Sequence, residues 1–132
     1  MFDLTTQILV VDDMLTMRKL VQKACKEIGF TSFVEADNGR KAWEVLQANP
    51  TVGLILSDWN MPESTGIDLL KRVRGDTRFK GVPFLLITAE AEKDQVVEAI
   101  KAGASNYVVK PFTTDALREK IEATHKKITG QT

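Results

Sequence analysis

Four short apolar runs in this chain each end in a polar side chain, and this feature constrains the fold most. Apolar runs of this length are typical of strands that are buried on both faces of a parallel sheet. A carboxylate at the end of such a strand is costly unless a positive charge lies close to it. Because ligand chemistry in open parallel sheets lies at the carboxyl edge, the polar ends indicate a functional site there. The runs with their polar ends are Ile8–Val11 with Asp12 and Asp13, Val52–Leu56 with Ser57 and Asp58, Phe84–Ile87 with Thr88, and Tyr107–Val109 with Lys110.

Segments with helical periodicity alternate with strand-like segments along the chain. The strands are expected at residues 7–11, 32–36, 52–58, 84–88 and 106–109. Pro62–Gly66 is expected to be a loop. The helices between the strands and after the last one are expected to bury apolar faces. These faces consist, in chain order, of Met17, Leu20, Val21, Ala24 and Ile28; Ala42, Trp43, Val45 and Leu46; Ile67, Leu70 and Val73; Val96, Val97 and Ile100; and Leu117, Ile121 and Ile128.

This alternation predicts an α/β fold, a doubly wound and mostly parallel sheet with helices on both faces. Right-handed crossovers allow only a few strand orders for such a sheet. One of them is the known flavodoxin-like order 2-1-3-4-5, in which the first and third strands are neighbours at the switch point. In that (βα)5 arrangement Asp12, Asp13 and Asp58 would converge.

The length of 132 residues fits one domain. We expect a single domain over residues 1–132, with a core at about residues 6–128 and no output domain. The 18 Lys and Arg residues balance the 18 Asp and Glu residues, which argues against bulk electrostatic binding to nucleic acid or an anionic membrane.

The start of the chain lacks the pattern of a signal peptide, and no apolar run reaches the length of a membrane span. The single cysteine, Cys25, cannot form an intramolecular disulfide. Together these features favour a reducing cytoplasm. Cys25 falls on a helical apolar stripe, so we expect it to pack in the core.

Three carboxylates at one sheet edge would repel one another and raise each other's pKa values. A hard divalent cation with oxygen ligands removes this repulsion, and Mg²⁺ fits because it takes one or two carboxylates together with water and phosphate oxygens. The alternative is that Asp12 and Asp13 only cap the first helix and that Asp58 only starts a turn.

Lys110 and Thr88 favour the metal-site interpretation. Each ends an apolar strand, so an ammonium group and a hydroxyl would reach the same edge. Acidic groups, a cation, a hydroxyl and a lysine resemble the parts that phosphoryl transfer requires. The acceptor would be a carboxylate, and the product an acyl phosphate. The glycine-rich loop of nucleotide triphosphatases is absent from the sequence.

The motifs resemble the receiver domain of two-component response regulators, over essentially the whole chain. Within that family they are most similar to the stand-alone chemotaxis regulators. The resemblance also implies a cis peptide bond between Lys110 and Pro111. The motifs are Leu9–Asp13, Asp58–Pro62, Thr88–Glu90, Gly103–Ser105 and Tyr107–Thr113.

The resemblance implies that Asp58 accepts the phosphoryl group. It implies Mg²⁺ as cofactor, bound by the carboxylates of Asp13 and Asp58, by the backbone carbonyl of Asn60, and largely through water by Asp12. Lys110 would pair with the phosphoryl oxygens or, without phosphate, with Asp58. On this interpretation the chain is no enzyme beyond catalysing its own phosphorylation and dephosphorylation.

The resemblance also implies the moving parts of a switch. Thr88 would bond to the phosphoryl group, and Tyr107 would turn inward and form part of an output face with Lys120. Asn60 and Glu90 resemble the pair that tunes loss of the phosphoryl group. Trp59 is expected to be partly exposed and to cover the pocket.

The implied partners are a chemotaxis histidine kinase, a flagellar motor switch protein and a phosphatase. Neither nucleic acid nor a membrane is implied, and a monomer is expected. Three alternatives remain: a phosphate sink or relay shuttle, a Mg²⁺-dependent phosphatase with an aspartyl-phosphate intermediate, and a flavodoxin-like electron carrier. The phosphatase class typically has Asp-x-Asp after its first strand, whereas Asp12 and Asp13 are adjacent here. An acidic loop after the first strand would repel a flavin phosphate.

Overall fold

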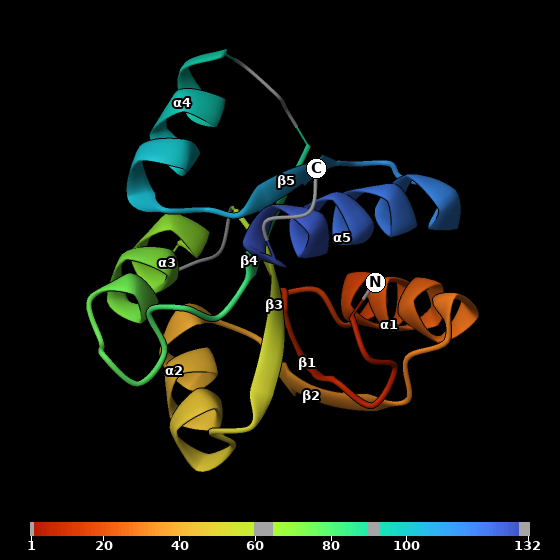
Figure 1. The fold of residues 1–132 in the computed structure, drawn as a ribbon, viewed down its shortest axis with the longest axis horizontal. Helices are drawn as coiled ribbons and strands as arrows, with labels where there is room; N and C mark the ends of the chain where they lie inside the picture. The colour runs from red at the N-terminus through yellow and green to blue at the C-terminus, as the bar shows by residue number, and fades with distance from the viewer. Residues whose placement is uncertain (1, 60–64, 90–92, 130–132) are drawn as a thin grey trace.

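The computed structural model describes residues 2–59, 65–89 and 93–129. Within these residues a five-stranded parallel sheet has the order β2-β1-β3-β4-β5, as predicted (Figure 1). The strand bounds also agree with the predicted ones. The elements are β1 (Gln7–Val11), α1 (Leu15–Ile28), β2 (Ser32–Ala36), α2 (Gly39–Ala48), β3 (Val52–Asp58), α3 (Gly66–Arg74), β4 (Phe84–Thr88), α4 (Lys93–Ala102), β5 (Asn106–Val109) and α5 (Thr114–Thr129).

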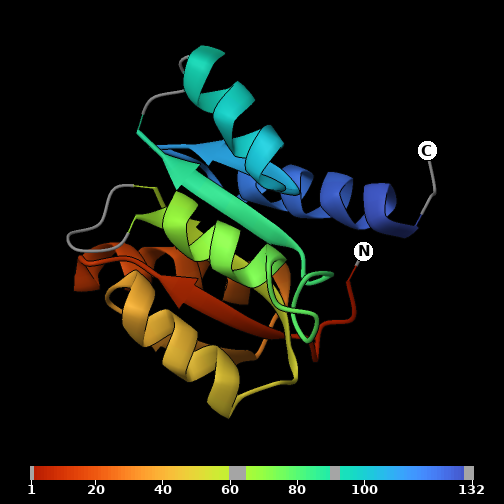
Figure 2. The same cartoon turned by 90° about the vertical axis from the view of Figure 1, so that its left-hand side faces the viewer.

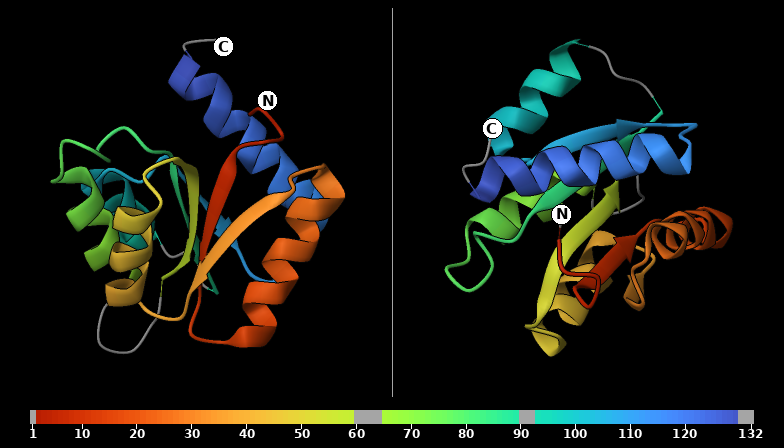
Figure 3. Two further views of the ribbon diagram at one scale, coloured as in Figure 1. Left: turned by 90° about the horizontal axis from the view of Figure 1, so that it is seen from below. Right: turned by 45° about the vertical axis from the view of Figure 1, so that its right-hand side comes forward.

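Helices cover both faces of the sheet, with α1 and α5 on one face and α2, α3 and α4 on the other. Figure 2 turns the layer of α2, α3 and α4 toward the viewer, and Figure 3 shows both layers from below. The central strands are buried on both sides because helices cover both faces of the sheet (Figure 1). Successive side chains of a strand point to opposite faces and so enter different clusters. Leu9 and Val11 join the cluster beneath α2 and α3, whereas Ile8 and Val10 join the cluster beneath α1 and α5.

The register of the sheet aligns the carboxyl ends of four strands. Val11, the last residue of β1, pairs with Ser57, which immediately precedes Asp58. On the next pair of strands, Asp58 lies beside Ile87, and Thr88 lies beside Val109. The polar residues that end these strands are therefore brought to a single edge of the sheet.

Helix α3 begins at Gly66, although Gly66 was expected to lie in a loop. Thr65 accepts a hydrogen bond from the Asp68 backbone, and Asp68 accepts one from the Thr65 backbone, so the two form a capping box. A Cβ on Gly66 would collide with the carbonyl oxygen of Asp58, and the Gly66 amide donates to the Trp59 carbonyl at 2.9 Å. The start of α3 is thus packed directly against the end of β3.

Helix α1 buries a narrower face than its periodicity predicts. Val21, Ala24 and Cys25 are buried, but Leu20 is 50% exposed. The expectation for Leu20 was wrong because α1 packs against the sheet and beside α5, which leaves this residue at the rim of the helix pair. Cys25 lies in the core as predicted, and burial raises the pKa of its thiol to about 12.

Helix α4 likewise exposes two residues of its predicted apolar face. Val97 and Ile100 are exposed, whereas Ala99 is buried. Both expectations were wrong because α4 packs through small side chains on the opposite side of the helix. No helix in the part of the chain that the structure describes is long and apolar enough to span a bilayer.

Candidate functional site

Three carboxylates meet at the carboxyl edge of the sheet. Asp12 and Asp13 follow β1, and Asp58 ends β3, which is the neighbouring strand. One carboxylate oxygen from each lies within 4.8 Å of the others. Asp12 and Asp58 are only 2% and 6% exposed, whereas Asp13 is exposed. The convergence that the strand order predicts is therefore confirmed.

Lys110 reaches the same cluster from the end of β5. Its Nζ lies 2.9 Å from Oδ1 of Asp58 and 3.5 Å from Oδ2 of Asp12. The backbone amide of Lys110 donates a hydrogen bond to the Thr88 carbonyl at 2.7 Å, which holds the Lys110 backbone beside the end of β4. The bond between Lys110 and Pro111 is cis, as the resemblance implied. Burial by itself lowers the pKa of Lys110, but the hydrogen bond and charge of Asp58, with a contribution from Asp12, raise it above the usual value.

The electrostatics of the cluster suit a divalent cation. Burial raises the pKa of Asp12, and the charge of Asp58 adds to the effect, against opposing contributions from the Met14 amide and Lys110. Three carboxylates facing one lysine leave an excess of negative charge at a partly buried site. Mg²⁺ takes oxygen ligands and would offset this excess, so the donor set fits the metal.

The capping alternative for the acidic residues is not supported. Oδ1 of Asp12 accepts from the Met14 amide at 2.9 Å, but Met14 is itself the residue that precedes α1. No side chain caps that helix end. Asp12 therefore shapes the turn between β1 and α1, and its second oxygen faces Lys110.

Thr88 is buried at the end of β4, at the edge where the acidic cluster lies. Trp59 was expected to be partly exposed, but it is buried, with 8% of its surface accessible. The expectation was wrong because the Trp59 amide continues the ladder to the Ile87 carbonyl at 2.9 Å, and the indole packs into the core beneath α2 and α3. Asn60 and Glu90 lie outside the described residues.

The family profile described as "Response regulator receiver domain" matches residues 8–122. The chain belongs to this family. The receiver domain has curated relatives that are named as chemotaxis proteins. It is 47% identical to chemotaxis protein CheY1 of Helicobacter pylori over 116 residues, which is 88% of this chain and 94% of that protein. It is 47% identical to chemotaxis protein CheY of Pseudomonas aeruginosa over 124 residues, 94% of this chain and 99% of that one.

Solved structures agree with this assignment. The structure of chemotaxis response regulator CheY4 of Vibrio cholerae superposes with a TM-score of 0.83 at 30% identity, over 91% of this chain and 98% of that one. A response regulator receiver domain protein from Clostridium thermocellum has a TM-score of 0.81 at 23% identity, which supports the fold alone. The chain is thus a CheY-like chemotaxis response regulator receiver domain.

Two further residues of the receiver domain lie outside the acidic cluster. Tyr107 on β5 is half-buried, and Nζ of Lys120 on α5 lies 4.7 Å from the centre of its ring. This pair joins β5 to α5 on the side of the molecule that also carries α4 (Figure 1). Both residues were expected on an output face, and that assignment stays a prediction, because their contact does not by itself assign either residue a role.

Sequence reasoning missed Arg18 and Glu35. Nη1 of Arg18 donates to the carbonyl oxygen of Asp12 at 2.7 Å, and its Nε donates to Glu35 at 3.1 Å. The available signal was weak: Glu35 is a carboxylate inside an apolar strand, and Arg18 stands one turn into the helix that follows the acidic pair.

Proposed function

We propose that this receiver domain accepts a phosphoryl group on Asp58 from the phosphohistidine of a histidine kinase. The observation that carries the proposal is the position of the Asp58 carboxylate, buried at the sheet edge between two further carboxylates and Lys110. A buried acceptor with charge-neutralising neighbours matches the requirement of phosphoryl transfer, in which catalysis consists mainly of positioning and electrostatic stabilisation.

In the proposed reaction, an oxygen of the Asp58 carboxylate attacks phosphorus. The bond between phosphorus and the histidine nitrogen breaks, its electron pair stays on the imidazole, and an acyl phosphate remains on Asp58. Asp12, Asp13, Asp58 and the backbone carbonyl of Asn60 would hold Mg²⁺. When bound, the metal would supply positive charge for the phosphoryl oxygens. Lys110 would leave the carboxylate oxygen of Asp58 and pair with a phosphoryl oxygen.

The phosphoryl group would bias an equilibrium between two conformations. Thr88, at the end of β4, would donate a hydrogen bond from its hydroxyl to a phosphoryl oxygen. Tyr107 would turn inward, and the face formed by α4, β5 and α5, with Tyr107 and Lys120, would then bind a flagellar motor switch protein more tightly. A nearly complete switch requires that phosphorylation favour the active state by about 5.5 kcal/mol.

Dephosphorylation would return the domain to its resting state. Asn60 and Glu90 would set the rate at which water reaches the acyl phosphate, and a phosphatase would accelerate this step. Both residues lie close to the site in the sequence, since Asn60 lies two positions after Asp58 and Glu90 two positions after Thr88.

Incubation with acetyl phosphate tests the acceptor chemistry without a kinase. In the presence of Mg²⁺ we expect the intact mass to rise by one phosphoryl group, because the acidic cluster then carries a counter-charge. With EDTA in place of Mg²⁺ we expect no gain. The same gain in both samples would show that the acidic cluster is not a metal site for this reaction.

A further inference from the structure

Arg18 is bonded to the loop that carries the acidic pair at two points. Its side-chain Nη1 donates to the Asp12 carbonyl oxygen at 2.7 Å. Its backbone amide donates to the Met14 carbonyl oxygen at 3.0 Å. Asp13 lies between these two carbonyls in the sequence. One residue of α1 therefore constrains both ends of the three-residue turn that presents Asp12 and Asp13.

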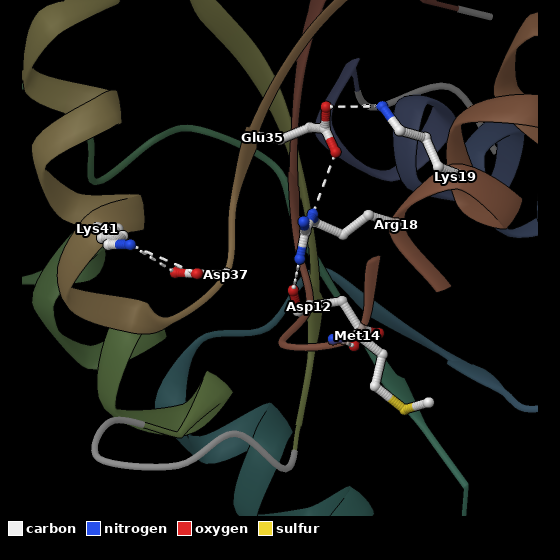
Figure 4. Close-up of polar contacts among 7 residues, drawn as sticks. All are labelled: Asp12, Met14, Arg18, Lys19, Glu35, Asp37 and Lys41. Carbon is white, nitrogen blue, oxygen red and sulfur yellow. Dashed lines mark hydrogen bonds and ion pairs between the residues drawn. The ribbon is translucent and has the colours of Figure 1, made fainter. Parts of the chain in front are cut away.

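Glu35 in turn holds the guanidinium of Arg18. Oε1 of Glu35 lies 3.1 Å from Nε of Arg18, and Oε2 accepts from Nζ of Lys19 at 3.0 Å. Figure 4 shows Arg18 between Glu35 on one side and Asp12 on the other. The Arg18 side chain is only 15% exposed, whereas that of Lys19 is 59% exposed. Burial raises the pKa of Glu35, but the hydrogen bonds from Lys19 and Arg18 outweigh burial and lower it.

The geometry of the guanidinium explains why the position requires an arginine. Its planar fork presents donors in fixed directions, so Nε can bond to Glu35 while Nη1 bonds to Asp12. Glu35 belongs to edge strand β2, which pairs with β1 through Val10. The strand next to β1 thus sets the orientation of Arg18, and Arg18 sets the orientation of the turn after β1.

We infer that Arg18, anchored by Glu35, is a positioning residue for the metal site, acting through the Asp12 backbone. The inference rests on the proposed function, because it takes the acidic cluster to be the Mg²⁺ site. Arg18 is bonded to the carbonyl rather than to the carboxylate of Asp12, so it leaves the carboxylate free to face the cluster. Some residues orient the metal ligands without binding the metal themselves. Their replacement typically changes metal affinity by about 10–100-fold.

The sign of the effect separates positioning from electrostatics. Arg18 is a cation beside a metal site, so removal of its charge alone should tighten Mg²⁺ binding. Loss of positioning should weaken binding instead. For Arg18→Met we expect Mg²⁺ affinity to fall by about tenfold.

Lys19→Met is the matched control. It removes the same charge from the same helix and the same partner, Glu35, but among the residues that the structure describes Lys19 forms no hydrogen bond to the acidic turn. Its Mg²⁺ affinity should stay within about twofold of the wild-type value, since only the exposed charge changes. Arg18→Lys keeps the charge but loses the fork, and we expect it to weaken binding by a few-fold as well.

The test is a Mg²⁺ titration of the wild-type protein and the three variants, read by tryptophan emission. Of the two tryptophans, Trp59 adjoins Asp58 in the sequence and Trp43 does not. Urea unfolding with EDTA establishes that each variant is folded. About tenfold weaker binding by Arg18→Met, with Lys19→Met near wild type, supports the inference. Equal or tighter binding by Arg18→Met overturns the inference while the proposed metal site stands. A wild-type protein that binds no Mg²⁺ overturns both.

Discussion

Asp58→Asn is expected to reduce phosphoryl uptake below detection. The amide has nearly the same shape as the carboxylate, but its oxygen is a poor nucleophile and cannot form the acyl phosphate. The fold should persist, because the amide oxygen can still accept the hydrogen bond that Lys110 now gives to Oδ1 of Asp58 at 2.9 Å. The measurement is intact mass after incubation with acetyl phosphate and Mg²⁺.

Asp37→Asn is the control for this experiment. Asp37 is an aspartate in the neighbouring loop that pairs with Lys41 and takes no part in the acidic cluster. This variant should gain one phosphoryl group at the wild-type rate. If Asp58→Asn also gained one at that rate, Asp58 would not be the acceptor, and peptide mapping would locate the residue that is.

Lys110→Met is expected to separate phosphorylation from switching. The variant keeps the three carboxylates, so it should still bind Mg²⁺ and still be modified on Asp58. It loses the ammonium group that would pair with a phosphoryl oxygen, so the active conformation would no longer be favoured. The readout is the affinity for a motor switch peptide with and without the phosphoryl mimic beryllofluoride.

Lys80→Met, at an exposed lysine in the α3–β4 turn, is the control and should switch normally. Full activation of Lys110→Met would show that the role assigned to Lys110 is wrong.

The same variant should alter the alkaline limb of the stability profile. The folded pKa of Lys110 is raised, so its ion pairs contribute stability below the unfolded pKa. This contribution is lost as pH rises through the folded pKa. Without Mg²⁺, Lys110→Met should be less stable than wild type at neutral pH, and the difference should shrink at strongly alkaline pH. Urea unfolding at several pH values measures it.

The strands and the acidic cluster were predictable because both follow from local patterns. An apolar run fixes a buried strand, and the residue that follows it must lie at the sheet edge, so Asp12 and Asp58 could be placed together once the order was known. The resemblance to receiver domains added the assignments that spacing could not make, above all the acceptor role of Asp58.

Other features could not be predicted from local sequence patterns. The buried indole of Trp59 depends on a ladder bond to Ile87 in a different strand, and the exposure of Leu20 depends on where α5 meets α1. The hydrogen bond that Arg18 forms with Glu35 depends on the rotation of α1 relative to β2. Helical periodicity defines which residues share a face, but it does not define which residue of another element that face meets.

The central claim is that phosphorylation of Asp58 controls binding to the flagellar motor. Calorimetric titration with a peptide from the N-terminus of a flagellar motor switch protein tests it most directly, with Mg²⁺ alone and with Mg²⁺ plus beryllofluoride. We predict that beryllofluoride tightens binding by about tenfold or more, within the usual range of allosteric coupling. Absence of binding in both states, with acetyl phosphate still modifying Asp58, would contradict motor control and favour a phosphate sink or relay shuttle.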